Sequence, residues 1–287
     1  MNAAIPSPSS ESGPRLARRS VLKRLGLGWV GLPGGMGLAS MLGGCGYLPR
    51  ASAVPMPLLS EPAAASGRSD TLVVMLPGRF DRPQDFVREG LVADLKRRRA
   101  DVDVLLADAH LGYYMDRSVL ERLRTDVIGP ARRQGYRRVW LAGISLGGFG
   151  ALGYAARHGR EAGAEIDGVL AIAPYLGSDE VVAAIGRTGG PRLWLDSPER
   201  LRAIDLEQDV WQYLAEPPVG APPVFLGYGR ADRMSNAHRL AAGLLPTGRV
   251  MQADGGHDWA PWRALWQQWL AQGPMATLED RGAGRPV

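Results

Sequence analysis

The feature that most constrains the fold is a regular alternation of short apolar runs with longer amphipathic segments between residues 70 and 273. Buried strands are expected at 71–76, 102–107, 138–142, 168–173, 223–228 and 249–253. Helices are expected between and after them, at 83–98, 117–134, 148–158, 234–244 and 259–271. Apolar strands that alternate with helices are typical of a parallel sheet buried on both faces. The sequence therefore predicts an α/β domain with a mainly parallel sheet of about six strands and helices on both faces, with no meander of strands before residue 71.

One pentapeptide at the end of the third expected strand contains a candidate nucleophile. Gly143-Ile144-Ser145-Leu146-Gly147 follows the apolar run 138–142 and opens the small-residue helical segment 148–158. A serine hydroxyl is a weak nucleophile, so it is activated on a tight strand-to-helix turn where a base reaches it and the helix N-terminus faces the developing oxyanion. A serine between glycines is usually only a turn. With 38 glycines in the chain, the pentapeptide needs partners to be meaningful.

Partners of the right kind follow later in the chain. Asp232 comes just after the expected strand 223–228, and His257 lies in the loop after the last expected strand. Asp205 and Asp254 are rivals for the acid, because aspartates commonly end strands and begin turns. Asp254 is so near His257 in sequence that it is better suited to shaping the turn, and Asp232 is preferred.

The other three histidines have different settings. His110 ends a strand, where it is a candidate for lining a pocket. His158 lies near a helix end, as a C-terminal cap, and His238 lies in a polar helix. Only His257 follows the last strand.

These residues resemble the α/β-hydrolase superfamily. The order Ser145, Asp232, His257 is the one found in that superfamily. The run Gly255-Gly256-His257-Asp258-Trp259 is similar to the C-terminal motif of its esterase-D-like and feruloyl-esterase-like members. The resemblance covers about residues 70–273. It implies that Ser145 attacks a carbonyl carbon, that His257 moves the proton, and that Asp232 orients and stabilises His257.

The resemblance also implies an oxyanion hole. The backbone N–H of Leu146, the residue after the nucleophile, is the first expected donor, and the second should come from the loop after the first core strand. We expect the N–H of Arg79 to be that donor. Many relatives have a His-Gly pair where this chain has Pro77-Gly78, so the loop departs from the common pattern.

Several aromatic residues are candidates for substrate contact. Tyr113 and Tyr114 follow the second strand, and Trp259 follows His257. The long connection 176–222, which often carries a cap in this superfamily, contains Trp194, Trp211 and Tyr213, which either contact an acyl chain or ring or pack on the sheet. The four tryptophans from Trp259 to Trp269 have largely helical spacing, which favours seating the last helix on the sheet.

The N-terminal region has the marks of an export signal. Arg18-Arg19-Ser20-Val21-Leu22-Lys23 resembles the twin-arginine pattern, and the Gly-rich apolar segment 25–44 is interrupted by Pro33. Leu42-Gly43-Gly44-Cys45 resembles a bacterial lipobox, and Cys45 is the only cysteine. These patterns predict a signal peptide over 1–44 and a lipid anchor on Cys45. The alternatives are an uncleaved transmembrane anchor and a chance Gly-Gly-Cys.

The rest of the organisation follows from composition. Residues 45–69 are rich in Pro, Ala and Ser and predict a flexible tether, residues 70–273 form the hydrolase domain, and 274–287 are expected to be a disordered tail. The net charge of +5 falls to about +1 without the leader, whose Lys and Arg exceed its Glu by four. Nucleic acid is therefore not an expected partner.

The sequence thus predicts an exported, lipid-anchored serine hydrolase of the cell envelope, on its periplasmic or extracellular face, which cleaves carboxylic esters through an acyl-enzyme. Its partners would be a small-molecule, lipid or polysaccharide ester and the membrane that holds its anchor. No metal or cofactor is expected, because the histidines are scattered. The protein is expected to be a monomer. An acyltransferase or peptidase using the same triad, or a non-catalytic binding lipoprotein with this fold, are the alternatives.

Overall fold

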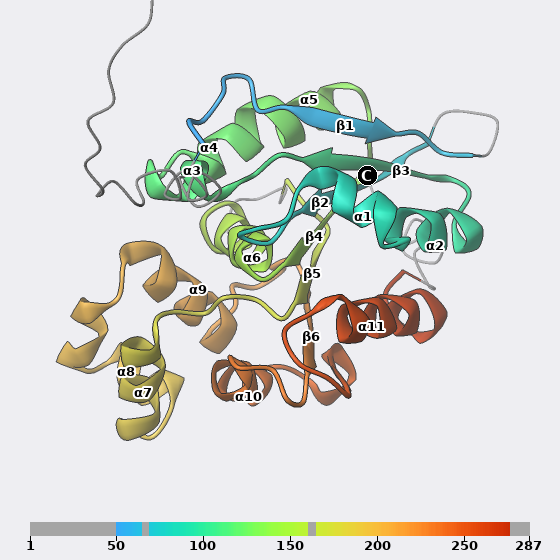
Figure 1. The fold of residues 1–287 in the computed structure, drawn as a ribbon. Helices are drawn as coiled ribbons and strands as arrows, with labels where there is room; N and C mark the ends of the chain where they lie inside the picture. Colours follow the sequence, from blue (N-terminus) through green and yellow to red (C-terminus); the bar gives the residue numbers. More distant parts are fainter. Residues whose placement is uncertain (1–49, 65–68, 160–164, 276–287) are drawn as a thin grey trace, which may run out of the picture. The chain divides into compact units, whose positions relative to one another are not determined.

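The centre of the protein is a seven-stranded sheet with the strand order β1-β3-β2-β4-β5-β6-β7 (Figure 1). The computed structural model describes residues 50–64, 69–159 and 165–275. The strands are β1 (Leu58–Glu61), β2 (Thr71–Leu76), β3 (Val102–Ala107), β4 (Arg138–Ile144), β5 (Gly168–Ile172), β6 (Val224–Gly229) and β7 (Val250–Ala253). All neighbouring pairs from β3 to β7 are parallel, and β1 pairs antiparallel with β3. The predicted α/β fold and parallel sheet are confirmed.

Helices cover both faces of this sheet. One face is covered by α1 (Pro83–Arg88), α2 (Leu91–Arg98) and α11 (Trp259–Gln272), and α2 and α11 lie side by side (Figure 1). The helices of the other core are α3 (Leu111–Met115), α4 (Val119–Arg122), a π-helical segment (Leu123–Ile128), α5 (Gly129–Arg133), α6 (Leu146–His158), α7 (Asp179–Arg187), α8 (Pro191–Leu195), α9 (Asp205–Ala215) and α10 (Ser235–Ala242). Short 3-10 segments cover Pro198–Arg202 and Thr247–Arg249. The single helix expected at 83–98 is divided at Gly90, whose φ is 83°.

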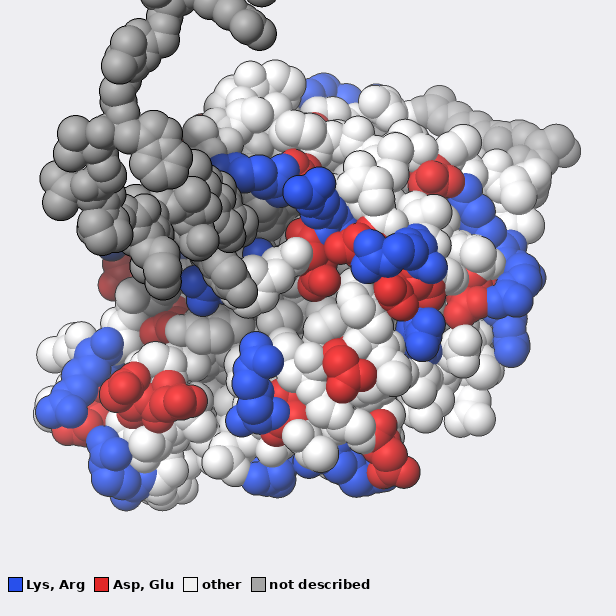
Figure 2. Space-filling model, in the orientation of Figure 1, with Lys and Arg blue, Asp and Glu red and all other residues white. Residues whose placement is uncertain are grey.

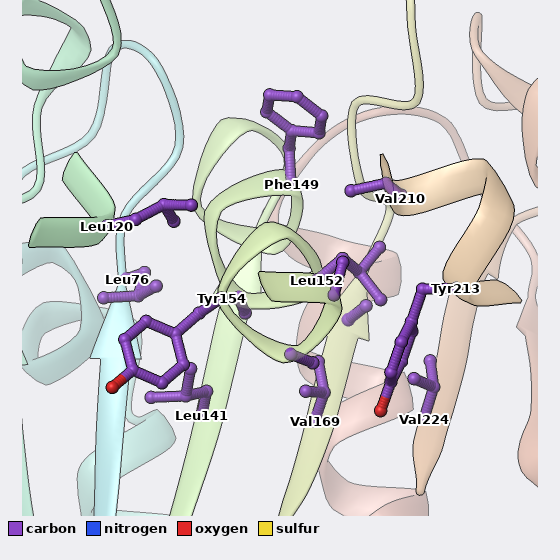
Figure 3. Packing of buried hydrophobic residues seen from close by; sticks show 14 of the residues in the cluster. Leu76, Leu120, Leu141, Phe149, Leu152, Tyr154, Val169, Val210, Tyr213 and Val224 are labelled. Carbon is purple, nitrogen blue, oxygen red and sulfur yellow. The ribbon is translucent and has the colours of Figure 1, made fainter. Parts of the chain in front are cut away.

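The two cores explain why the strands are apolar throughout. Along β2, Leu72 and Val74 belong to the core on the side of α6, whereas Val73 belongs to the core on the side of α11. Successive side chains of a strand point to opposite faces, so burial on both faces requires an uninterrupted apolar run. Figure 3 shows the first core from nearby: Leu152 and Tyr154 extend from α6 beside the strands, whereas Phe149 projects from the upper end of the helix.

The start of helix α6 packs so closely on the sheet that the backbone of the helix touches the backbone of the strands. A Cβ at Gly143 would overlap the carbonyl oxygen of Gly147, and a Cβ at Gly147 would overlap the carbonyl oxygen of Leu76 at the end of β2. Glycine is therefore required at both positions for steric reasons. The flanking glycines of the pentapeptide serve to bring the helix onto β2 and β4.

The N-terminal boundary of the folded domain differs from the prediction. Residues 50–64 were expected to belong to a tether, but they contain β1 and bury Met56 to 2% exposure. The Arg50 guanidinium makes two hydrogen bonds of 2.8 Å to the Asp108 carboxylate, and the N–H of Met56 donates to Asp126. β1 has only four residues with half-exposed side chains, so its pairing with β3 defines it rather than any apolar period of its own. The sheet therefore has seven strands rather than six.

The C-terminal boundary also lies beyond the prediction. Met275, expected in a disordered tail, is fully buried in the core beside α11, and its carbonyl oxygen accepts a hydrogen bond from Arg99. The predicted signal peptide over 1–44 and Cys45 lie outside the described residues. In the part of the chain that the structure describes, no helix is both long and apolar enough to cross a bilayer.

The aromatic residues of the connection between β5 and β6 pack inside the protein. Trp194 and Trp211 are fully buried, and Tyr213 is 2% exposed. The Trp211 indole N–H donates to the carbonyl oxygen of Leu176, and the Tyr213 hydroxyl donates to that of Pro222. These three side chains therefore pack in the protein interior, which was one of the two predicted alternatives, and none of them lines the cavity. The tryptophans of α11 do the same at Trp262, Trp266 and Trp269, and only Trp259 remains half-exposed.

The close approach of α6 leads to a testable difference between two helical glycines. Gly147→Ala should lower the free energy of unfolding by about 3 kcal/mol or more, because the new methyl group meets backbone atoms that cannot move aside. Gly186→Ala in α7 is the matched control: a Cβ there meets nothing within 4 Å, so it should stabilise by about 0.5–1 kcal/mol. Denaturant unfolding measures both. Equal effects at the two positions would contradict the steric argument.

Candidate active site

The site lies where the connections of the sheet diverge. After β2 the chain enters α1 and α2 on one face, and after β4 it enters α6 on the other face. At such a switch point the carboxyl ends of adjacent parallel strands leave a crevice between diverging connections. The loop 77–82 and Ser145 both follow strands that end at this crevice.

Ser145 occupies the turn between β4 and α6 in a strained conformation. Its φ is 53° and its ψ is −114°, a region that disfavours residues with a Cβ. Three backbone hydrogen bonds hold the turn: Ser145 N–H donates to Ile172 (2.9 Å), and the Ser145 carbonyl accepts from Phe149 (3.1 Å) and Tyr175 (3.0 Å). The turn directs the hydroxyl away from the helix axis and out of the end of the sheet, where it borders the pocket.

The loops that carry Asp232 and His257 are joined to each other. Ala231 N–H donates to the carbonyl oxygen of Gly255 at 2.9 Å, and Gly255 adopts a φ of 124°. A Cβ at Gly229 would overlap the same carbonyl oxygen, so the close contact requires glycine. The loop after β7 is thereby held against the loop after β6, which places His257 beside Asp232.

Ser145, His257 and Asp232 form a continuous hydrogen-bonded chain. His257 Nε2 lies 2.9 Å from Ser145 Oγ, and His257 Nδ1 lies 2.7 Å from Asp232 Oδ2. Because the Asp232 carboxylate only accepts hydrogen bonds, Nδ1 carries the proton in neutral His257 and Nε2 accepts from the Ser145 hydroxyl. The second oxygen, Asp232 Oδ1, accepts the N–H of Met234 at 2.8 Å. The structure therefore brings together the three residues that the sequence separates.

The two rival aspartates lie elsewhere. The Asp254 side chain is 95% exposed and pairs with Arg230. Asp205 is the first residue of α9 and lies at the border of the pocket, whereas the acid contacting His257 is Asp232.

Burial and hydrogen bonding compete at Asp232. The side chain has no exposed surface, which by itself raises the pKa of a carboxyl group. The hydrogen bonds from His257 and from the Met234 N–H outweigh burial, so the pKa of Asp232 lies below its ordinary value. Asp232 is thus held as an anion beside the imidazole.

The candidate oxyanion donors lie on either side of Ser145. Leu146 is the first residue of α6, where a backbone N–H has no partner within the helix. Arg79 belongs to the loop after β2, which comes close to the serine: a Cβ built on Gly78 would lie 3.6 Å from Ser145 Cβ. Arg79 and Leu146 both line the pocket.

Asp81 fastens this loop to the histidine side of the site. Its carboxylate accepts hydrogen bonds from the backbone N–H of Gly78 and from the indole of Trp259. Burial, reinforced by the nearby charge of Asp85, raises the pKa of Asp81. The sequence motif gave no indication of this contact, although Asp81 lies only a few residues beyond the expected oxyanion donor.

Two tryptophans that follow His257 in the sequence pack beside it and line the pocket. The ring of Trp262 meets the ring of His257 edge to face, with centroids 5.0 Å apart, and Trp259 packs edge to face against both Trp262 and Phe86. Trp259, predicted to contact substrate, lines the pocket.

A cavity of about 850 Å³ opens at Ser145. Tyr114 lines it as predicted, whereas Tyr113 does not: Tyr113 is fully buried, and its hydroxyl bonds to the backbone of Ala53. Neighbouring residues of the short helix α3 point in different directions, and the Tyr113 side chain binds the N-terminal segment through its hydrogen bonds to Ala53. His110 caps α3 by accepting the N–H of Gly112 and is likewise outside the pocket lining.

Other lining residues were missed by sequence reasoning. Tyr175 follows β5, and Phe149 comes one turn after Ser145; their rings pack edge to face with centroids 5.3 Å apart. Ile204 and Leu206 come from the start of α9. Tyr175 was detectable as an aromatic residue just past a strand end, but nothing local marks Ile204 or Leu206.

The other two histidines lie outside the hydrogen-bonded chain of Ser145, His257 and Asp232. His238, in α10, is fully buried, and its Nε2 lies 2.9 Å from the carbonyl oxygen of Pro174. Burial lowers the pKa of His238, which favours the neutral imidazole. His158 ends α6 and packs against Tyr154.

Charges on the protein surface are interspersed. On the face in Figure 2, basic and acidic side chains of the described residues lie close together. The basic run at the end of α2 is largely paired: Lys96 with Glu61, Arg97 with Asp94 and Arg99 with Asp101. Within residues 50–64, 69–159 and 165–275, no group of three or more His, Cys, Asp or Glu side chains is placed to hold a metal ion.

The raised pKa of Asp81 predicts the sign of a pH effect on stability. Above the folded-state pKa of Asp81, ionisation of its carboxyl group lowers the free energy of unfolding. Below the unfolded-state pKa of about 3.8 the group is protonated in both states, and this loss of stability disappears. Asp81→Asn keeps an acceptor for Gly78 and Trp259 but removes the charge. We expect this variant to be more stable than wild type at pH 7, with the gain shrinking as pH falls toward 3.5, in denaturant unfolding over a pH series.

Asp70→Asn is the control with the opposite sign. The hydrogen bond from Arg138 is the main cause that lowers the pKa of Asp70 to about 2. Its ionised form therefore adds stability above the unfolded pKa, and this contribution is lost as pH falls toward 2. The control variant should be less stable than wild type at pH 7. A loss of stability in Asp81→Asn that matches this control would contradict the account of Asp81.

Comparisons with known proteins identify the fold. No family model matches the sequence, and no curated protein matches it. A Staphylococcus aureus protein classed provisionally as an esterase is similar with a TM-score of 0.53 at 14% identity, over 77% of this chain and 81% of that one. An alpha/beta hydrolase enzyme from the metagenome of lagoon sediments of Mar Chica, Morocco, has a TM-score of 0.50 at 18% identity, over 75% of this chain and 94% of that one. With its parallel sheet and helices on both faces, the chain has the α/β-hydrolase fold.

Proposed function

We propose that this protein is a serine hydrolase that cleaves carboxylic esters through an acyl-enzyme. The observation that carries the proposal is the hydrogen-bonded chain from Ser145 Oγ through His257 to Asp232, which opens into a cavity. One structural neighbour is classed provisionally as an esterase and the other is described as an alpha/beta hydrolase enzyme, which is compatible with this chemistry. The chain contains the nucleophile, the base and the orienting acid that acyl transfer requires.

The geometry suggests the following course of reaction. His257 Nε2 takes the proton of Ser145 Oγ as the oxygen attacks the ester carbonyl carbon, and Asp232 stabilises the imidazolium that forms. The tetrahedral oxyanion accepts hydrogen bonds from the N–H groups of Leu146 and Arg79. His257 then returns the proton to the leaving alkoxide, which departs as an alcohol. Water deprotonated by His257 attacks the acyl-enzyme and releases the acid and free Ser145.

Asp81 contributes to this course by position. Its hydrogen bonds to Gly78 and Trp259 connect the loop of one oxyanion donor to the segment that follows the base. Donors aimed at a developing charge act best when they are already fixed before the reaction. The carboxylate therefore reduces the motion of the Arg79 N–H relative to Ser145.

The direct test is covalent labelling of the full-length protein with a fluorophosphonate, followed by peptide mass analysis. We expect a single adduct at Ser145, because only a serine activated by a base reacts readily. His257→Ala should lose labelling almost completely. Asp232→Ala should keep more residual activity than His257→Ala, because the acid does not take up the proton. Thr188→Ala serves as a hydroxyl control, since Thr188 caps a helix end away from the pocket.

Outcomes of this test have separate meanings. An adduct at another residue, or full ester hydrolysis by Ser145→Ala, would overturn the assignment of the nucleophile. Folded wild-type protein that is neither labelled nor active on any ester would favour a non-catalytic binding role.

We further propose that the hydrolase is exported and anchored through a lipid on Cys45. The support is the sequence alone: the twin-arginine pattern, the apolar segment after it and the lipobox-like Leu42-Gly43-Gly44-Cys45 point to the same route. The folded domain then faces the periplasm or the exterior. Because β1 begins at Leu58, the length of chain between the anchor and the sheet is shorter than the sequence suggested.

Cys45→Ser tests the anchor. We expect this variant to lose acylation and to move from the membrane fraction to the soluble fraction, because no other cysteine exists to take its place. Sedimentation with immunoblotting, together with intact-mass analysis for the lipid, measures this change. Retention of Cys45→Ser in the membrane fraction would favour an uncleaved signal anchor instead.

A further inference from the structure

The cavity at Ser145 is elongated along helix α6. Its lining includes Ser145, Leu146 and Phe149 near the start of the helix and Arg157 near its end. At about 1.5 Å per residue, Ser145 and Arg157 are separated by about 18 Å along the axis. In Figure 3, Phe149 projects from the upper end of α6, with Leu120 of α4 on one side of the helix and Val210 of α9 on the other. We refer to this space as the α6 groove.

The walls of the α6 groove are mainly apolar. Helix α4 provides one wall and the start of α9 provides the other. The apolar side chains that matter here are Val119, Leu120, Leu146, Phe149, Ile204 and Leu206. The ionisable side chains of the same lining are Arg79, Asp81, Arg117, Asp205, Arg233, His257 and Asp258, together with Arg157, which pairs with Asp209.

Two glycines of α6 allow the walls to come close. A Cβ at Gly150 would overlap the Tyr114 hydroxyl, and a Cβ at Gly153 would lie 2.9 Å from Leu206 Cδ1. Tyr114, from α3, and Leu206, from α9, therefore contact the helix directly. A space that extends along a helix in this way suits an elongated ligand.

The polar groups of the groove also limit the class of ligand. A peptide or a sugar in this space would bring amide or hydroxyl groups that must find hydrogen-bond partners. Between the ends of the groove, the Tyr114 hydroxyl is buried, and no partner for it is found among the described residues. An apolar chain leaves no polar group of its own unpaired. The groove is therefore suited to methylenes.

We propose that the α6 groove binds the acyl chain of the substrate and makes the protein selective for esters of medium and long fatty acids. This inference rests on the proposed function, because it identifies which ester Ser145 attacks. A membrane core about 30 Å thick holds two layers of chains, so one lipid chain spans roughly 15 Å. The positions of Ser145 and Arg157, about 18 Å apart along the helix axis, are separated by enough length for such a chain.

The mouth of the pocket supports the same class of substrate. Phe80, Met115 and Ile204 line the pocket, and their side chains are exposed by 69%, 64% and 56% respectively. They come from three separate segments: the loop after β2, the end of α3 and the residue before α9. Exposed apolar side chains around an opening provide apolar surface that an entering chain can contact.

The experiment is a series of p-nitrophenyl esters from acetate to dodecanoate, used with the full-length protein below the concentrations at which the esters aggregate. Each methylene that enters the groove is worth about a fourfold gain in kcat/KM at most. We expect octanoate to exceed acetate by at least about tenfold in kcat/KM, and the gain to end when the groove is full. Acetate turned over as well as or better than octanoate would overturn the proposal.

Leu206→Trp places bulk in the groove and should remove the preference for long chains, measured as the ratio of kcat/KM for octanoate to kcat/KM for acetate. Leu201→Trp is the matched control, because Leu201 belongs to the same connection, is 73% exposed and does not line the pocket. It should keep the wild-type profile. If Leu206→Trp fails to fold, Leu206→Ala replaces it and should reduce the gain per methylene. An unchanged chain-length profile in the folded Leu206 variant would contradict the proposal.

Labelling distinguishes a failure of this inference from a failure of the proposed function. Protein that is labelled at Ser145 and hydrolyses acetate, without any gain for longer chains, remains an esterase but has no acyl groove. Protein that is neither labelled nor active on any chain length is not a serine hydrolase, and both proposals then fail.

Discussion

The contact between the start of α6 and the ends of β2 and β4 is the constraint on which the rest of the site depends. Gly143 and Gly147 let the helix touch the strand backbone, and this contact forces Ser145 into a turn with a φ of 53°. The same turn leaves the N–H of Leu146 without a helical partner. Strain in the backbone is tolerated here because packing on both sides and three backbone hydrogen bonds over-determine the turn.

Around this turn, each loop of the site is fixed by a contact with a neighbouring loop. The loop with Asp232 is joined to the loop with His257 through the N–H of Ala231. Asp81 joins the loop after β2 to Trp259. These polar contacts carry a cost, since Asp81 has a raised pKa and Asp232 is an anion without exposed surface. The stability lost to buried charge is offset by two apolar cores that run along both faces of the sheet.

The site and the α6 groove share one structural element. Helix α6 begins directly after Ser145, seats Leu152 and Tyr154 on the sheet (Figure 3), and lines the α6 groove with Leu146 and Phe149. Glycines of the same helix admit Tyr114 and Leu206. A single helix thus connects Ser145 with the apolar lining of the cavity.

The sequence by itself determined the fold class and the candidate residues that the structure brings together. Alternating apolar and amphipathic segments encode a parallel sheet buried on both faces, and local turn chemistry marks Ser145, Asp232 and His257. The edge strand β1 and the burial of Met275 were decided by tertiary structure, because pairing with β3 and packing beside α11 leave no periodic signal in the segments themselves. Whether Tyr113 or Tyr114 faces the pocket was likewise decided in three dimensions, since adjacent residues of one short helix look alike in sequence but point in different directions.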